Sequence, residues 1–224
     1  MESINIICLL WKGDFRGRDY NEKDVYSLKK NIDRYIDREY KFYCLTNDMS
    51  ADVPAEKIQL LNNWPGWWSK VELFRPDLPP GRTLYMDLDS HIVGRLQPIL
   101  ECEGNLVMFN SNKPCRMWYD LQDDGWLYRY QAATMLFDPG ALSWIYDKFA
   151  MCPERFMFKY RSEQDMYGDW IPDQPTFPDH WMMKLESLKG KKEFPKGIII
   201  ITGKPGRDSF RDPAFAPWLK KYWV

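Results

Sequence analysis

Two apolar stretches on either side of an amphipathic helix constrain the fold of this chain more than any other feature. Residues Ile4–Trp11 are almost all apolar, which is typical of a strand buried on both faces of a sheet. Apolar side chains then recur at helical spacing from residue 25 to 36, with Asn21 or Asp24 as the N-cap, and Tyr40–Leu45 follows as a second strand. A strand, a helix and a strand in this order predict a parallel α/β sheet with right-handed crossovers.

The rest of the chain continues this alternation. Further strands are predicted at Lys57–Leu61, Thr83–Met86, Asn105–Asn110, Ala132–Phe137 and Ile198–Ile201. Helices are predicted between Trp64 and Arg75, with Trp67, Val71 and Phe74 facing inward, and from Asp138-Pro139 and Ser162 onward. We therefore expect one α/β domain over residues 1–224, with a mostly parallel central sheet flanked by helices.

The composition indicates where in the cell the protein is expected and which kinds of partner it can bind. The net charge of -1 gives no general attraction to nucleic acid or to an acidic membrane. Five cysteines without a Cys-x-x-Cys pair indicate reduced thiols, as in the cytoplasm. The apolar run Ile4–Trp11 is too short to span a membrane, so we expect a soluble cytoplasmic protein with no transmembrane segment. A basic cluster at Lys189, Lys191 and Lys192 leaves room for peripheral contact with anionic lipid or glycan.

The sequence Asp87-Leu88-Asp89 is the strongest chemical signal in the chain, and it is the only Asp-x-Asp pair. It ends the predicted strand Thr83–Met86, and in extended chain both carboxylates would point the same way while Leu88 points back to the core. Two carboxylates at the end of a buried strand repel each other, and a hard cation such as Mg²⁺ or Mn²⁺ relieves this when it also binds a diphosphate. The alternative interpretation is that the strand simply ends here and that both carboxylates are solvated and bind no metal.

Taken in order, the motifs of this chain resemble those of nucleotide-sugar-dependent glycosyltransferases of the GT-A fold, particularly small bacterial, phage and large-DNA-virus members. Asp87-Leu88-Asp89 matches the acidic metal-binding motif of that family. The segment Gly66–Phe74 resembles the helix before this motif, in which a basic residue, here Lys70, reaches the donor sugar or its phosphates. Ala132–Phe137 resembles the strand on the acceptor side.

Two later segments extend the resemblance. The sequence Ser162-Glu163-Gln164-Asp165 resembles the start of a helix that carries a carboxylate or amide near the reacting carbon. Thr202-Gly203-Lys204-Pro205 resembles a late segment of the form His-x-Gly-Lys-Pro, whose lysine reaches the diphosphate. This chain departs from the family in having Thr202 at the place of the metal-binding histidine, and alanines at positions 132 and 133 where small polar residues often open the acceptor strand.

The resemblance implies a single GT-A, Rossmann-like domain and a function. The chain would be a metal-dependent glycosyltransferase that uses Mn²⁺ or Mg²⁺ and moves a sugar from a nucleotide-sugar donor, by resemblance a UDP-sugar, to a glycan or other hydroxyl acceptor. Asp87 and Asp89 would bind the metal, and Asp165 or Glu163, with Asp165 preferred, would act near the anomeric carbon. The donor would lie on strand ends and on the helix before the acidic motif, at Leu10, Trp11, Lys12, Lys70, Met86, Leu88, Gly203 and Lys204.

Other classes of protein remain open from the sequence. A module with this fold could bind a nucleotide sugar without turning it over, and Thr202 in place of the histidine favours this alternative. A nucleotidyltransferase also uses paired aspartates on Mg²⁺. A phosphatase of the haloacid dehalogenase type begins with Asp-x-Asp after an apolar strand, but near the start of its fold, whereas Asp87 follows a complete βαβ unit. The sequence does not choose between inversion and retention at the anomeric centre.

Overall fold

The computed structural model describes residues 4–15, 20–110, 130–188 and 196–203. Its first half contains β1 (Ile4–Leu10), α1 (Glu22–Tyr35), β2 (Tyr40–Thr46), β3 (Glu56–Gln59), the 3₁₀ helix η1 (Gly66–Phe74), β4 (Thr83–Met86), β5 (Ser90–Ile92), α2 (Gln97–Leu100) and β6 (Leu106–Asn110). Its second half contains β7 (Tyr130–Phe137), α3 (Ser143–Met151), α4 (Pro153–Lys159), α5 (Glu163–Trp170), β8 (Thr176–Phe177), η2 (Asp179–Trp181), β9 (Met182–Lys184), η3 (Leu185–Leu188) and β10 (Ile200–Thr202).

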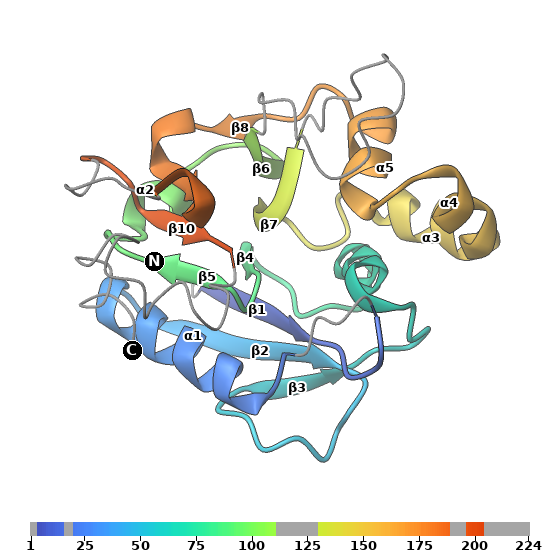
Figure 1. Ribbon diagram of the computed structural model, residues 1–224, viewed down its shortest axis with the longest axis horizontal. Coiled ribbons are helices and arrows are strands. Elements are labelled where there is room, and N and C mark those ends of the chain that lie inside the picture. The colour runs from blue at the N-terminus through green and yellow to red at the C-terminus, as the bar shows by residue number, and fades with distance from the viewer. Residues whose placement is uncertain (1–3, 16–19, 111–129, 189–195, 204–224) are drawn as a thin grey trace.

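The described strands form a seven-stranded sheet in the order β3-β2-β1-β4-β7-β6-β8 and a three-stranded sheet in the order β5-β10-β9. In the large sheet β1 pairs in parallel with β2 and β4, and β2 with β3. Only β7 runs against its neighbours β4 and β6. The predicted α/β class with a mostly parallel central sheet is therefore confirmed, and helices cover the sheet as Figure 1 shows.

Two apolar cores lie on opposite faces of the large sheet. One contains the α1 side chains together with β5 and β10, and the other contains η1, α3 and α5. Strand β1 is buried on both faces, as predicted, because its alternate side chains enter the two cores: Ile6 enters the first and Ile7 the second. This division matters for the site because residues of β4 alternate between the same two cores.

The start of α1 follows the predicted capping chemistry. The side chain of Asn21 accepts a hydrogen bond from the backbone N–H of Lys23, and the carboxylate of Asp24 accepts one from the backbone N–H of Asn21. Both candidate residues thus take part, Asn21 as the N-cap and Asp24 as its reciprocal partner.

Two local predictions differ from the structure. The helix expected from Asp138-Pro139 begins only at Ser143, because Gly140 adopts a φ of 82° and the chain makes turns before it becomes helical. On η1, Val71 and Phe74 are buried as predicted, but Trp68 is more fully buried than Trp67, which packs against the same core while partly exposed. A 3₁₀ helix has three residues per turn, so residues 68, 71 and 74 share a face, whereas an α-helical period would select 67.

The last described strand closes one side of the predicted site. Strand β10 pairs antiparallel with β5, which places Thr202 opposite Ser90, and the backbone N–H of Gly203 donates to the carbonyl of Asp89 over 3.1 Å. The late segment and the acidic motif, far apart in sequence, are therefore neighbours. Within the described residues, no helix is both long and apolar enough to cross a membrane.

Candidate active site

Asp87 stands where β4 leaves the sheet. Its backbone N–H donates to the carbonyl of Ala133 on β7 over 2.8 Å, and its own carbonyl accepts from Ser90 over 3.0 Å. The chain therefore turns after Asp87, and the extended alternation assumed for the acidic motif does not reach Asp89. Asp87 continues the face of Tyr85, which belongs to the core of η1 and α5, whereas Leu88 is buried in the α1 core as predicted.

Lys70 binds Asp87 from the middle of η1. Its ammonium Nζ lies 2.8 Å from Oδ1 and 2.9 Å from Oδ2 of Asp87, 3.3 Å from the carbonyl oxygen of Ala132 and 3.4 Å from Oε1 of Glu163. An ammonium has three N–H donors, and these three groups can take all of them. The side chain is only 9% exposed, so Lys70 fixes the neighbouring carboxylates and has no N–H left for a phosphate unless one of these contacts is released.

The charges of this cluster shift its proton affinities. Burial alone would lower the pKa of Lys70, but the carboxylates of Asp87 and Glu163 outweigh burial and raise that pKa above its ordinary value. Burial, assisted by the charge of Asp87, raises the pKa of Glu163, although Lys70 acts in the opposite direction. The hydroxyl of Tyr85 also donates to Oδ1 of Asp87. Asp87 is thus held by two donors, and its side chain, 21% exposed, is the part of the cluster that reaches solvent.

Glu163 is the first residue of α5 and is fully buried. Apart from its ion pair with Lys70, neither carboxylate oxygen has a well-aligned hydrogen bond within the described residues, and the hydroxyls of Tyr167 and Ser162 are likewise buried without one. Buried polar atoms normally have partners. This group of buried oxygens is therefore a place where an internal water would be stabilised.

Asp89 is held separately from Asp87. Its Oδ2 accepts a hydrogen bond of 2.9 Å from the hydroxyl of Tyr20, which precedes α1. Together with the hydrogen bond from Gly203 to the carbonyl of Asp89, this joins the segment before the start of α1, the turn after β4 and the end of β10 at one residue. Because β1 pairs in parallel with β4, the carboxyl ends of these two strands and the end of β10, which the sequence predicted as the place of the donor, lie close together.

The other predicted site residues lie around this centre. Asp165 forms an ion pair with Arg161 over 3.0 Å, whereas Glu163 forms one with Lys70, so α5 directs Glu163 rather than Asp165 into the cluster. Lys12 is bound by Glu22 and Asp48, and the two hydrogen bonds together raise its pKa. The indole of Trp11 donates to Asn63. The side chains of Leu10, Met86 and Leu88 are buried, so only their backbone could meet a donor, and Lys204 lies outside the described residues.

Tyr85 and Tyr20 are site residues that the sequence analysis did not single out. The sequence pattern could have identified Tyr85, because a residue two positions before Asp87 on a strand lies on the same face of the sheet. Tyr20 was not, since nothing in the local sequence indicates that the loop after β1 returns to the acidic motif.

The donor set fits a divalent cation only in combination with a ligand. Within the described residues no group of three or more His, Cys, Asp or Glu side chains could hold a metal ion by itself. Asp87 and Asp89 supply hard carboxylate oxygens, and Mg²⁺ is commonly bound by one or two carboxylates together with substrate phosphates. Thr202 ends β10 beside this turn but offers only a hydroxyl. The residues thus suit a metal that is bound jointly with a diphosphate.

Comparison with family models and with curated proteins gives no match. Among solved structures, the chain is similar to the apo form of the glycosyltransferase GlyE from Streptococcus pneumoniae TIGR4, with 12% identity and a TM-score of 0.65. The similarity covers 100% of this chain but 59% of GlyE, so the chain spans less than two thirds of that protein.

A second similar structure is the galactosyltransferase LgtC in complex with donor and acceptor sugar analogues, with 12% identity and a TM-score of 0.62 over 97% of this chain and 93% of LgtC. An active-site mutant of LgtC gives 10% identity and a TM-score of 0.64. At these identities the likeness shows the fold alone. The chain has the GT-A-like α/β fold that these glycosyltransferases share.

Proposed function

We propose that this protein is a metal-dependent glycosyltransferase that moves a sugar from a nucleoside diphosphate-sugar, with UDP as the favoured nucleotide, to a hydroxyl of a glycan. The observation that carries the proposal is the cluster of Lys70, Asp87 and Glu163 at the end of β4, beside Asp89 and the end of β10. A nucleotide-binding α/β sheet places its ligand beyond the carboxyl ends of its strands, where this cluster lies.

The reaction would break the bond between the anomeric carbon and the diphosphate oxygen, while the acceptor oxygen bonds to that carbon and loses its proton. Bound at Asp87 and Asp89 with the diphosphate, Mn²⁺ or Mg²⁺ would supply positive charge to the leaving group. Lys70 and Tyr85 hold Asp87 in one orientation, and Tyr20 holds Asp89. Glu163 balances the charge of Lys70 from its buried position behind Asp87.

Nucleotide release from a panel of UDP-, GDP- and dTDP-sugars tests this proposal. Many transferases slowly hydrolyse their donor when no acceptor is present, so we expect release from one donor with Mn²⁺ and none with a chelator. Asp89→Ala should lower release by at least ~100-fold, the scale of losing one electrostatic partner of a developing charge. Asp52→Ala, which removes an exposed carboxylate before β3, is the matched control and should leave release unchanged.

Each result of the nucleotide-release test favours a different class of protein. Release that persists with the chelator would contradict the metal requirement. Tight UDP binding without release or transfer would identify a binding module, which the threonine at position 202 favours. Pyrophosphate formed from a nucleoside triphosphate would identify a nucleotidyltransferase, and phosphate released from small phosphoesters would identify a phosphatase.

Glu163 and Asp165 should respond differently to loss of charge. In Glu163→Gln the amide cannot balance Lys70, so the ammonium interacts more strongly with Asp87 and weakens its hold on a cation. We expect the Mn²⁺ concentration for half-maximal nucleotide release to rise about tenfold, equivalent to about 1.4 kcal/mol. Asp165→Asn weakens the contacts of Asp165 with Arg161 but keeps those of Lys70 with Asp87 and Glu163, so the Mn²⁺ requirement should not change.

A Mn²⁺ titration of nucleotide release by both variants checks this prediction. A larger rise in Asp165→Asn than in Glu163→Gln would show that the carboxylate assignment from the geometry is wrong.

A further inference from the structure

A hydrogen-bonded network joins the loops that follow β1, β2 and β3. Trp11 follows β1, Asn47 follows β2, and Asn63 lies in the segment between β3 and η1. The side-chain amide of Asn47 accepts from the backbone N–H of Lys12 and donates to its carbonyl, both over 2.8 Å. The same amide nitrogen also donates to Oδ1 of Asn63 over 2.8 Å, so Asn47 connects the loop after β1 to Asn63.

The orientation of the Asn63 amide follows from its partners. The indole Nε1 of Trp11 can only donate, and it lies 2.9 Å from the Asn63 side chain, so the atom that faces it is the oxygen Oδ1. Both N–H groups of Nδ2 are then directed away from Trp11 and Asn47. The residue is exposed, and neither N–H group has an acceptor among the described residues. The network therefore presents two hydrogen-bond donors outward.

The backbone of Asn63 has an uncommon conformation. Its φ of 51° is the only positive φ of a non-glycine residue in the part of the chain that the structure describes. Asparagine tolerates this conformation better than most residues, but surrounding contacts must hold it. The carboxylate of Glu72 supplies such contacts, since it accepts from the backbone N–H groups of Leu61 and Asn62. The amide of Asn63 is thus held in one position from both sides.

The indole ring of Trp11 is fixed beside this amide. A Cβ added to Gly13 would lie 2.2 Å from Cη2 of the ring, so the backbone of Gly13 lies directly against the indole. Phe15 meets the same ring edge-to-face, with centroids 6.4 Å apart. Trp11 is nevertheless only partly buried. An aromatic ring that is held in place and still reaches solvent is suited to stacking on a nucleobase, because every base has a π face.

The network lies beside the proposed metal and diphosphate site. Strand β1 pairs in parallel with β4 on one side and with β2 on the other, so the carboxyl ends of these strands follow one another across the sheet. Neighbouring strands are about 4.8 Å apart, which puts the end of β2 roughly 10 Å from the end of β4. The ribose and base of a nucleoside diphosphate can bridge that span from a diphosphate bound at Asp87.

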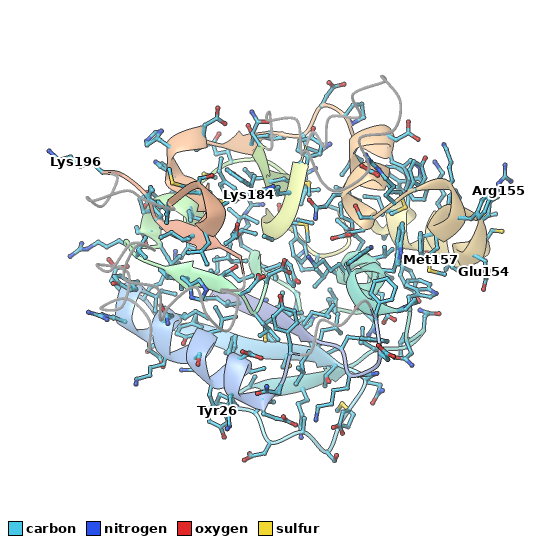
Figure 2. The ribbon with its side chains drawn as sticks, in the orientation of Figure 1. Tyr26, Glu154, Arg155, Met157, Lys184 and Lys196 are labelled. Carbon is cyan, nitrogen blue, oxygen red and sulfur yellow. The ribbon has the colours of Figure 1, made fainter. Side chains whose placement is uncertain are left out.

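The strand ends lie between the two layers that cover the sheet. In Figure 2, Tyr26 marks α1 on one face of the large sheet, and Met157, which packs against the core on the other face, marks α4. The arrowheads of β1, β2 and β3 in Figure 1 lie together at one edge of the sheet. The loops that carry Trp11, Asn47 and Asn63 extend from this edge.

We propose that Trp11 and Asn63 form the nucleobase subsite of the donor and that they select uracil. Trp11 stacks on the base, and Nδ2 of Asn63 donates to the carbonyl oxygen at position 4. Cytosine has an amino group at that position, so the N–H groups of Asn63 would meet another donor instead of an acceptor. The inference rests on the proposed function, because it locates the base of that donor and assigns the residue that reads it.

Binding of UDP and CDP tests the subsite without relying on turnover, because their bases differ in the group at position 4. Isothermal titration calorimetry on the full chain with Mn²⁺ would give both dissociation constants. Inorganic pyrophosphate with Mn²⁺ measures the diphosphate site alone. We expect UDP to bind about tenfold more tightly than CDP, the scale of one hydrogen bond that is left unmatched.

Asn63→Asp should remove this preference. Aspartate keeps an oxygen for Trp11 and Asn47 and tolerates a positive φ, but it replaces both N–H donors by an acceptor. The carboxylate repels the oxygen of uracil and accepts from the amino group of cytosine, so the ratio of the two dissociation constants should change about tenfold in favour of CDP. Asn62→Asp is the matched control. It adds the same charge one residue away, where the amide binds Tyr146 on α3 over 2.9 Å, and should leave the ratio unchanged.

Trp11→Leu tests the stacking surface. Loss of the ring should weaken UDP and CDP equally, by about tenfold, because stacking acts on either base. Binding of pyrophosphate should not change, since pyrophosphate has no base. An equal loss for pyrophosphate would show that Trp11 supports the fold of the loop and would overturn its assignment to the base.

The nucleobase subsite and the proposed function fail in different ways. Equal or tighter binding of CDP by the wild-type protein, pyrophosphate binding without binding of UDP, or an equal change of the ratio in Asn63→Asp and Asn62→Asp would overturn the subsite. Failure of the wild-type protein to release nucleotide from any donor sugar would instead overturn the proposed function, whichever of the two nucleotides binds more tightly.

Discussion

Lys70→Met is expected to abolish nucleotide release and to lower the free energy of unfolding by about 3–5 kcal/mol. The ammonium of Lys70 is buried between two carboxylates and contacts both, at 2.8 Å from Asp87 and 3.4 Å from Glu163. Methionine has a similar length but no charge, so the variant leaves Glu163 buried without a counter-ion and Asp87 without its main donor. Breaking a buried ion pair at one partner costs far more than the pair contributes as a whole.

A double variant separates the stability effect from the effect on activity. In Lys70→Met with Glu163→Gln, the buried carboxylate is replaced by a neutral amide, and we expect most of the lost stability to return. Nucleotide release should stay absent, because nothing then orients Asp87 from η1. Urea denaturation with a single probe of unfolding measures the first quantity. A stable Lys70→Met variant with normal nucleotide release would show that the cluster has no role at the site.

Local patterns predict much of this fold because they depend on neighbours in the sequence. The apolar run of β1, the period of α1 and its cap at Asn21 are all set within a few residues, and the structure contains each of them. The position of Asp87 at the end of β4 follows in the same way, since Thr83–Met86 is a buried strand in the structure as in the prediction.

The parts that sequence reasoning did not reach depend on tertiary packing. Whether Glu163 or Asp165 enters the cluster is decided by how α5 docks against β7 and η1, which no local pattern records. The buried face of η1 was misjudged because a 3₁₀ period replaced an α-helical one, which buries Trp68 more fully than Trp67. The hydrogen bond from Tyr20 to Asp89 joins residues 69 positions apart, and spacing gives no sign of it.

Glu72 also went unnoticed in the sequence, and its replacement by alanine is expected to lower the free energy of unfolding by about 3–5 kcal/mol. Its fully buried carboxylate accepts hydrogen bonds from the backbone N–H groups of Leu61 (2.7 Å) and Asn62 (2.8 Å) and pairs with Arg75 at 2.8 Å. One side chain thus joins the segment after β3 to η1. Alanine would leave a buried guanidinium short of a partner and release the segment that positions the helix of Lys70.

Asp77→Ala is the matched control, because Asp77 binds the same Arg75 at the same distance of 2.8 Å but its side chain is 58% exposed. Solvent screens such a pair, so its loss should cost less than ~1 kcal/mol. In thermal unfolding, Glu72→Ala should therefore lower Tm by about 10 °C and Asp77→Ala by no more than a few degrees. Equal shifts in the two variants would mean that burial does not set the strength of this network. A large loss confined to Glu72→Ala would show that η1, and with it the ammonium that orients Asp87, is held in place by a carboxylate outside the site.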